Sequence, residues 1–265
     1  MYNLGMPTLL EVRGVRENAL LCQSLGLGFL ELNMNLPWCC PENLPAAEAV
    51  RVCQEFDIDL TLHLPEELDL ASFHPPLRQA AVSRVRQAML WAQEARARVV
   101  TMHINPGIYF TMPERRAYIY DEFDHLFCAN LMESAEQVLA YAREAEITLS
   151  FENTGHFHLL YISHALELLA DLPGFWLTWD VGHDAASGYR ERNLLVRHAS
   201  RIAHMHLHDF DGARDHQPLF TGLVDIPEAL QFADEENLRV VLEVKTKEAL
   251  VQSVDALREH MLFVH

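Results

Sequence analysis

The chain has 265 residues and half of them are apolar, so it is long enough to bury a sizeable core as one large α/β domain or two small ones. Its 38 acidic residues outnumber the 20 basic ones, which argues against a nucleic-acid surface, because such a surface needs clustered Lys and Arg. No apolar run approaches the ~20 residues that span a bilayer, and the N-terminus lacks the pattern of a signal peptide. Composition therefore predicts a cytoplasmic protein with free thiols, no membrane partner and a small-molecule substrate.

Short apolar segments alternate with longer helical patterns along the whole chain. The expected elements, each time a strand and then a helix, cover residues 2–8 and 15–25, 29–33 and 45–56, 60–64 and 76–97, 99–104 and 121–146, 147–152 and 163–170, 175–180 and 191–200, 202–209 and 227–236, and 239–243 and 247–260. Residues 105–120 are expected to be irregular, and a loop of this length in a compact domain is typical of a functional segment. A surface segment that only packs on the domain is the alternative.

Repeated strand–helix units predict parallel strands that are joined by crossover helices. Eight such units in 265 residues predict a single α/β domain over residues 1–265, a (β/α)8 TIM barrel. An open doubly wound sheet is the alternative, but no Gly-rich phosphate fingerprint follows the first strand.

The expected strands are apolar on one face and polar on the other, because alternate side chains of a strand point to opposite sides. The stretch 202–209 is typical, with His204, His206 and His208 opposite its apolar residues. On the polar face the strands end in side chains that bind metals or transfer protons, namely His63, His103, Glu152, Asp180, His206 and Glu243. Buried ionisable groups need partners or a metal. We therefore expect a metal site at the barrel mouth, with a structural polar core as the alternative.

Four short motifs lie at the ends of the last four strands: Glu152-Asn153-Thr154, Asp180-Val181-Gly182-His183, His206-Leu207-His208-Asp209 and Glu243. With these motifs, and with its strand order over nearly the whole chain, the sequence resembles the xylose isomerase-like TIM barrel superfamily. That superfamily includes ketose 3-epimerases, hydroxypyruvate isomerases, inosose dehydratases and DNA repair enzymes of the endonuclease IV type.

The resemblance implies one divalent metal ion that is held by Glu152, Asp180, His206 and Glu243. Three carboxylates and one imidazole suit Mn²⁺ first, then Mg²⁺ or Co²⁺, and Zn²⁺ also fits. The implied activity is isomerisation or epimerisation of a small ketose or related polyol. Glu152 and Glu243 would move a proton next to a carbonyl through a metal-stabilised enediolate. Candidate substrate contacts are His63, His103, His183, Arg214, Trp38 and Tyr109.

The residues on either side of the expected ligand His206 have their own expected places. His204 is expected deeper in the barrel interior, and His208 is expected beyond the ligand at the rim, with its role open. Asp209 is expected to orient a neighbouring group. The partner is expected to be a small sugar or polyol, and a homo-oligomer is allowed.

Three alternatives stay open for the activity. The endonuclease branch implies a multi-zinc phosphodiesterase, in which His63, His103, His183 and His216 would bind additional zinc ions. This sequence departs from that branch two positions before His216, where Arg214 stands in place of an aspartate. An inosose dehydratase-like lyase would need the same proton abstraction, and a catalytically silent barrel would serve sensing or assembly.

Overall fold

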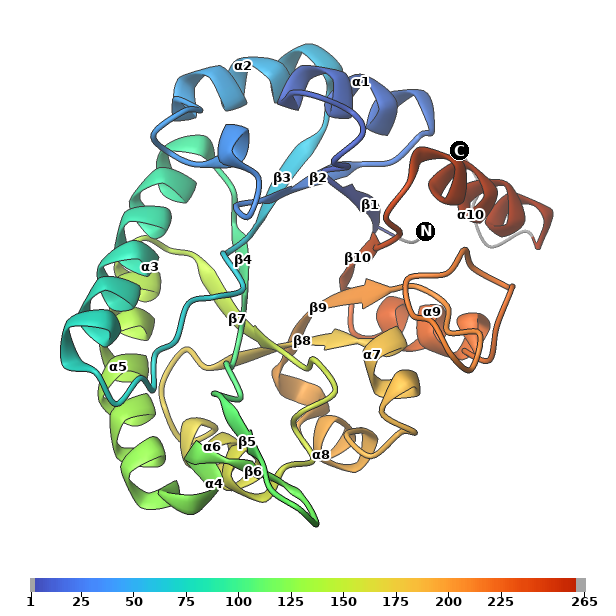
Figure 1. The fold of residues 1–265 in the computed structure, drawn as a ribbon. Helices are drawn as coiled ribbons and strands as arrows, with labels where there is room; N and C mark the ends of the chain where they lie inside the picture. Colours follow the sequence, from blue (N-terminus) through green and yellow to red (C-terminus); the bar gives the residue numbers. More distant parts are fainter. Residues whose placement is uncertain (1–2, 261–265) are drawn as a thin grey trace.

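The computed structural model describes residues 3–260, and its centre is a closed barrel of parallel strands surrounded by helices (Figure 1). The barrel strands are β1 Asn3–Pro7, β2 Phe29–Asn33, β3 Asp59–His63, β4 Val99–His103, β7 Thr148–Glu152, β8 Trp176–Asp180, β9 Ile202–Leu207 and β10 Arg239–Leu242. They follow one another around the barrel in the order β1-β10-β9-β8-β7-β4-β3-β2. The predicted TIM barrel is confirmed, and Tyr2, in the first predicted strand, lies outside the described residues.

The helices cover the outside of the barrel (Figure 1). They are α1 Val15–Ser24, α2 Ala46–Phe56, α3 Pro75–Ala95, α4 Ile119–Glu122, α5 Asp124–Glu144, α6 Leu160–Leu169, α7 Val181–Ala186, α8 Arg192–Arg197, α9 Ile226–Glu235 and α10 Lys247–Glu259, with short 3₁₀ turns η1 Pro37–Cys39 and η2 Ala199–Arg201. Within residues 3–260, no helix combines the length and the apolar character that crossing a membrane requires.

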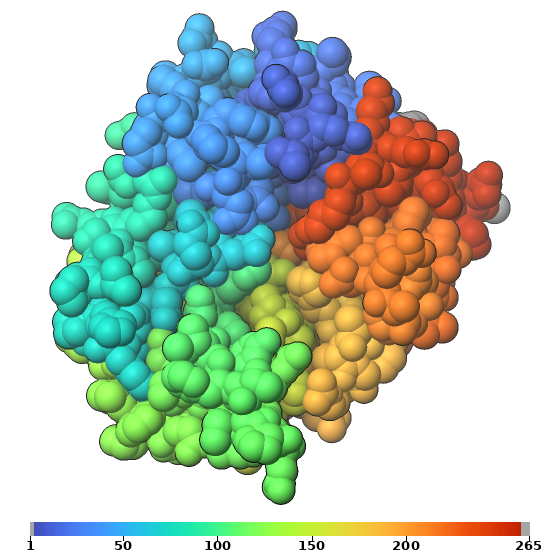
Figure 2. Space-filling view, viewed as in Figure 1, coloured from blue at the N-terminus to red at the C-terminus, as the bar shows by residue number. Residues whose placement is uncertain are grey.

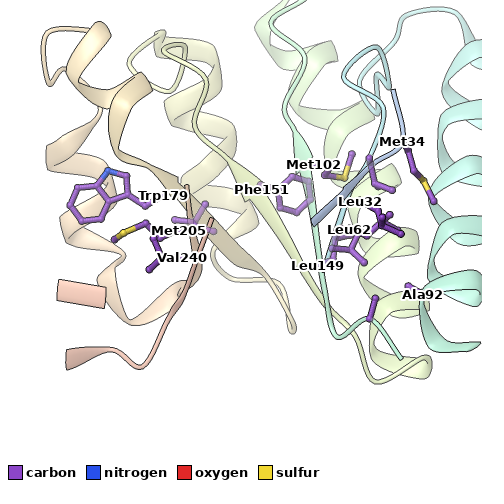
Figure 3. Close-up of a cluster of buried hydrophobic side chains, with 14 of the residues drawn as sticks. Leu32, Met34, Leu62, Ala92, Met102, Leu149, Phe151, Trp179, Met205 and Val240 are labelled. Atoms are coloured by element: carbon purple, nitrogen blue, oxygen red, sulfur yellow. The ribbon is translucent and has the colours of Figure 1, made fainter. Parts of the chain in front are cut away.

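The outward face of the barrel strands carries the hydrophobic core. Leu62, Leu149 and Leu177 are fully buried there, in one cluster with the apolar sides of the helices. Figure 3 shows part of this layer, with Leu62 and Leu149 on one side of the view and Met205 on the other. Burying one such side chain contributes about 1.5–3 kcal/mol, so this layer supplies the driving force that holds helices on the barrel.

The inward face of the same strands is polar, as the alternation of side chains predicts. Thr178 on β8 hydrogen-bonds to Ser150 on β7 at 2.7 Å and to Thr101 on β4 at 3.1 Å. Because β7 lies between β4 and β8, the three hydroxyls form one group on this side of the barrel. This side of the interior is therefore a hydrogen-bonded polar layer below the strand ends.

The segment after β4 differs from the prediction, because residues 105–120 are not irregular throughout. They contain an antiparallel hairpin of β5 Tyr109–Thr111 and β6 Arg116–Tyr118, followed by α4. The rings of Tyr109 and Tyr118 face each other across the hairpin at 5.6 Å, and the guanidinium of Arg116 lies over the ring of Tyr109. Cross-strand aromatic pairs of this kind stabilise short hairpins, and the alternation over three-residue strands is too brief to show in the sequence.

Candidate metal centre

Four predicted ligands come together at the carboxyl ends of four adjacent strands. Glu152 ends β7, Asp180 ends β8, His206 is on β9 and Glu243 follows β10 directly. These strands are consecutive around the barrel, so the four side chains converge. One ligand atom from each lies within 4.8 Å of the others. The surface has a hollow near the centre of the face shown in Figure 2, bordered by the green and orange segments of the chain.

The imidazole of His206 is at the centre of this group. Its Nδ1 lies 3.1 Å from Oε1 of Glu152, 3.0 Å from Oε2 of Glu243 and 4.0 Å from Oδ2 of Asp180. Burial opposes a charge on His206, but Glu152, Glu31 and Glu243 outweigh it and raise its pKa well above the usual range. Three carboxylates around one point repel each other unless a cation lies between them. The raised pKa of His206 favours a proton between the carboxylates, and a metal ion would replace that proton.

The donor set fits a divalent ion. Glu152, Asp180 and His206 are at most 1% exposed, and Oε2 of Glu243 is buried without a well-directed hydrogen bond. A buried carboxylate oxygen without such a donor is costly unless it binds a cation. Oxygen ligands with one imidazole suit Mn²⁺, Mg²⁺ or Co²⁺, so Glu152, Asp180, His206 and Glu243 are the residues that would hold the ion.

Two further predicted histidines contact the other oxygen of Glu152. Nε2 of His63 lies 3.0 Å and Nε2 of His103 lies 3.2 Å from Oε2. Burial opposes a charge on His63, but Glu152 more than compensates and raises the pKa of His63 to about 9. His63, His103 and Glu152 also form a group of three potential ligands, so Glu152 is shared between two clusters.

Asp180 is held by two histidines from different elements. His183 belongs to α7, a helix that the sequence pattern did not predict, and its Nδ1 lies 3.2 Å from Oδ2 of Asp180. Nε2 of His208 lies 3.1 Å from Oδ1. Asp180 also caps α7 by accepting the backbone N–H of His183. The cap explains why a helix of six residues begins at once after the strand.

The role of His208, left open by its sequence, follows from its other nitrogen. Nδ1 of His208 accepts the backbone N–H of His216 at 2.8 Å. A neutral imidazole that accepts at Nδ1 carries its proton on Nε2, which here faces Asp180. His208 therefore holds Asp180 in position, and it also lies in a group of three potential ligands with His183 and His216. A Cβ on Gly182 would lie 2.1 Å from the His208 ring, so this close packing requires glycine.

A lysine that the sequence reasoning missed lies at the edge of the ligand set. Nζ of Lys245 is 2.8 Å from Oε1 of Glu243. Lys245 is two positions after Glu243, so the same alternation that selected Glu243 would have indicated it. Burial opposes its charge, but Glu243 more than compensates and raises the pKa of Lys245. The ammonium holds one oxygen of Glu243 and leaves the other directed to His206.

Three predicted substrate contacts have other partners in the described structure. Arg214 is mostly exposed and pairs with Asp211 at 2.8 Å. Trp38, on η1, packs against the hydrophobic core, and Tyr109 lies on the β5–β6 hairpin. The structure brings His63, His103 and His183 to Glu152 and places Nε2 of His216 3.5 Å from Oε1 of Glu243. The roles of Arg214, Trp38 and Tyr109 stay predictions.

Two buried acids hold the loops around the site. Glu191 is fully buried and accepts hydrogen bonds from Nδ2 of Asn153 at 2.9 Å and from the backbone N–H of Gly155 at 3.2 Å. Asn153 also accepts the N–H of Asp180 at 2.7 Å, which ties the end of β7 to the end of β8. Asp209 accepts the N–H groups of residues 210, 221, 222 and 224, so it orders the loop after β9.

Comparisons with known proteins agree with this architecture. A model of the xylose isomerase-like TIM barrel family matches residues 20–262. A search among curated proteins finds no match.

Solved structures share the whole fold at low sequence identity. A D-tagatose 3-epimerase-like protein is 19% identical, with a TM-score of 0.76 over 98% of this chain and 97% of its own. The 3-keto-D-glucoside 4-epimerase of E. coli is 14% identical, with a TM-score of 0.76 over 99% of this chain and 100% of its own. A Thermus thermophilus protein soaked with zinc chloride is 24% identical, with a TM-score of 0.71 over 97% and 98%. At these identities the likeness establishes the fold.

Proposed function

Because the chain belongs to the xylose isomerase-like TIM barrel family, we propose that it is a divalent-metal-dependent sugar isomerase or epimerase. One observation carries the proposal: the carboxylates of Glu152, Asp180 and Glu243 converge on Nδ1 of His206 at the carboxyl-terminal mouth of the barrel. The mouth is where TIM-barrel enzymes keep their active sites. Sugar epimerases among the similar solved structures support a small ketose or related polyol as the substrate.

The proposed metal is Mn²⁺, because a site with three carboxylates and one imidazole offers mainly hard oxygen ligands. When bound, the ion would polarise the substrate carbonyl and offset negative charge on its oxygen. Burial raises the pKa of both carboxylates of the proton-transfer pair, but histidines outweigh it at Glu152, and Lys245 and His206 outweigh it at Glu243, so both pKa values lie below the usual range. An ionised carboxylate is able to accept a proton from the carbon next to the carbonyl.

Glu152 and Glu243 would act as the base and acid on opposite sides of the substrate. They extend from β7 and β10, which are separated by β8 and β9 around the barrel. One carboxylate would remove the proton, and the other, entering the turnover protonated, would deliver its own proton to the opposite face and invert the configuration at that carbon. Return to the adjacent carbon would give an isomer. His63, His103 and His183 lie within 4 Å of Glu152 and would donate hydrogen bonds to substrate oxygens.

The proposal is tested by elemental analysis followed by an isotope exchange assay. The purified protein is loaded with Mn²⁺, Mg²⁺, Co²⁺ or Zn²⁺ and incubated in D₂O with a panel of ketoses and sugar polyol derivatives. We expect deuterium at the carbon next to the carbonyl of at least one sugar, and loss of the exchange after chelator treatment. No exchange with any loaded metal would contradict the proposal.

A multi-zinc phosphodiesterase is the second candidate, favoured by the group of His63, His103 and Glu152 next to the first ligand set. The formal charge of −18 and the exposed Asp211–Arg214 pair weigh against it, because a nuclease must bind a polyanion. About three zinc ions per chain with cleavage of abasic DNA would establish it. A dehydratase of the inosose type would show deuterium exchange together with loss of water, which mass spectrometry of the product detects.

A further inference from the structure

We infer that Glu31, on β2, is a positioning residue that determines which nitrogen of His206 is offered to the metal. The inference rests on the proposed function only in that His206 is taken as a metal ligand. Glu31 lies on the side of the barrel away from β7 and β8 and is 2% exposed. Its Oε1 lies 2.9 Å from Nε2 of His206, on the opposite side of the imidazole from the ligand carboxylates.

The carboxylate of Glu31 is itself fixed from two directions. Oε2 accepts the hydroxyl hydrogen of Thr61 on β3 at 2.9 Å. Nε2 of His204 on β9 lies 3.0 Å from the same oxygen. With Oε2 occupied, Oε1 is the oxygen that faces His206. A buried carboxylate held by neighbouring strands cannot easily turn away, so its position relative to His206 is set by the barrel.

The position of Glu31 determines the tautomer of His206. A lone pair on Nε2 would face a carboxylate oxygen at 2.9 Å, and the two negative centres would repel each other. Nδ1 also faces carboxylate oxygens, those of Glu152 and Glu243 at 3.1 and 3.0 Å. An ion held by Glu152, Asp180 and Glu243 would take the place of the Nδ1 proton. The remaining proton would then stay on Nε2 beside Glu31, although this N–H does not point straight at the oxygen. A carboxylate behind a ligating histidine also raises its basicity, and loss of such a partner typically costs 10–100-fold in metal affinity.

The group of Glu31, His204 and His206 has a competing interpretation as a second metal site. Its members lie within the distance range of a ligand set. However, both Nε2 atoms approach the same carboxylate at 2.9–3.0 Å, which is hydrogen-bond distance. An ion bound there would have to displace the protons that these contacts need, and it would take Nε2 of His206 with it. We therefore assign the group to orientation of His206.

The test is a metal titration on two variants of Glu31 and a matched control. Glu31→Gln keeps an acceptor oxygen but loses the charge, whereas Glu31→Met loses both. Thr178→Val, the control, removes a buried hydroxyl from the same barrel interior, where its partners are Ser150 and Thr101. We expect the Mn²⁺ dissociation constant, measured by competition with a chelator, to rise by 10–100-fold in Glu31→Met. It should rise less in Glu31→Gln and stay unchanged in Thr178→Val.

Circular dichroism and thermal unfolding of the chelator-treated proteins show whether each variant is folded at the titration temperature. If Glu31→Met does not fold, the comparison of Glu31→Gln with the Thr178→Val control decides the question. Folded Glu31 variants that bind Mn²⁺ as tightly as the unaltered protein would overturn the inference. If the native protein binds two ions per chain and His204→Gln loses one of them, the inference is wrong and Glu31, His204 and His206 form a second metal site.

The titration also separates this inference from the proposed reaction. A native protein that binds no divalent ion would overturn the metal centre and the role of Glu31 together. Normal Mn²⁺ binding with the expected order of variants, but no deuterium exchange on any sugar, would overturn the reaction alone and leave the role of Glu31 intact.

Discussion

The outer and inner faces of the barrel strands use neighbouring residues for opposite purposes. Leu177 and Thr178 are adjacent on β8 and both are fully buried. Leu177 points into the apolar layer between barrel and helices, where it contributes by leaving water. Thr178 points into the barrel, where it is tolerated because Ser150 and Thr101 hydrogen-bond to it.

The comparison shows that residues that build the hydrophobic layer alternate, one by one along each strand, with residues that face the barrel interior. The outer layer needs apolar volume and tolerates swaps that conserve it. The inner layer needs each polar group to have a partner, and at the strand ends the partners are the carboxylates and imidazoles of the candidate metal centre. Substitutions at the inner strand ends should therefore change metal binding and the reaction rate, whereas substitutions in the outer layer or below the site should change the free energy of unfolding.

The largest expected effect is on the inner face at the strand ends. Glu152→Gln removes a ligand and one partner of the proposed proton-transfer pair while keeping the side-chain shape. We expect the rate of deuterium exchange to fall by about 10³-fold, within the range of general acid–base catalysis. The assay is run with saturating metal so that weaker binding does not hide the loss. A rate within tenfold of the native value would show that Glu152 is not part of the pair.

A large stability effect without a chemical one is expected on the outer face. Leu177→Ala removes a fully buried side chain from the hydrophobic layer. It should lower the free energy of unfolding by about 2–5 kcal/mol, because a cavity remains. Urea unfolding measures the loss, and exchange activity per folded molecule should be unchanged. A loss of activity larger than the loss of folded protein would mean that the two faces are coupled.

The buried carboxyl group of Glu191 should make the free energy of unfolding depend on pH. Burial raises the pKa of Glu191 from its ordinary value of 4.5 to about 7, even though N–H donors from Asn153 and residues 155 and 157 oppose the shift. The folded protein then binds this proton more tightly than the unfolded chain does. Its contribution to the free energy of unfolding therefore falls as pH rises from about 4.5 to about 7, by about 3 kcal/mol.

The variant Glu191→Gln lacks this titration. Urea unfolding of both proteins between pH 4.5 and 8 should give a difference in stability that changes with pH up to about 7 and is then constant. A difference that does not depend on pH over this range would show that Glu191 is ionised throughout.

The smallest expected effect is inside the barrel below the site. Thr178→Val keeps the volume but leaves the hydroxyls of Ser150 and Thr101 without one partner. We expect a loss of about 1–3 kcal/mol in the free energy of unfolding, the cost of unsatisfied buried polar groups. Comparison with Leu177→Ala by the same urea titration tests the two faces at adjacent positions. A more stable Thr178→Val protein would mean that the polar layer serves function at the expense of stability.

Much of this architecture could be predicted from the sequence, because alternation is a local property. The polar parity of the strands placed Glu152, Asp180 and Glu243 at strand ends, and the family resemblance implied that these three with His206 form the ligand set. The structure places the four together. The same parity placed His204 deeper than His206, where the structure has it bonded to Glu31. Short elements were missed, since the β5–β6 hairpin and α7 are too brief to show a period.

The sequence by itself determined the barrel, its apolar and polar faces and the set of groups at its mouth, because each depends on residues close together in the chain. Only the tertiary structure decided which groups face one another across the interior. Glu31 and His206 lie on strands that barrel closure brings together. Arg214 forms an ion pair with Asp211, whereas Lys245 forms one with the ligand carboxylate Glu243. Such contacts depend on strand register and on side-chain rotamers, which no local pattern specifies.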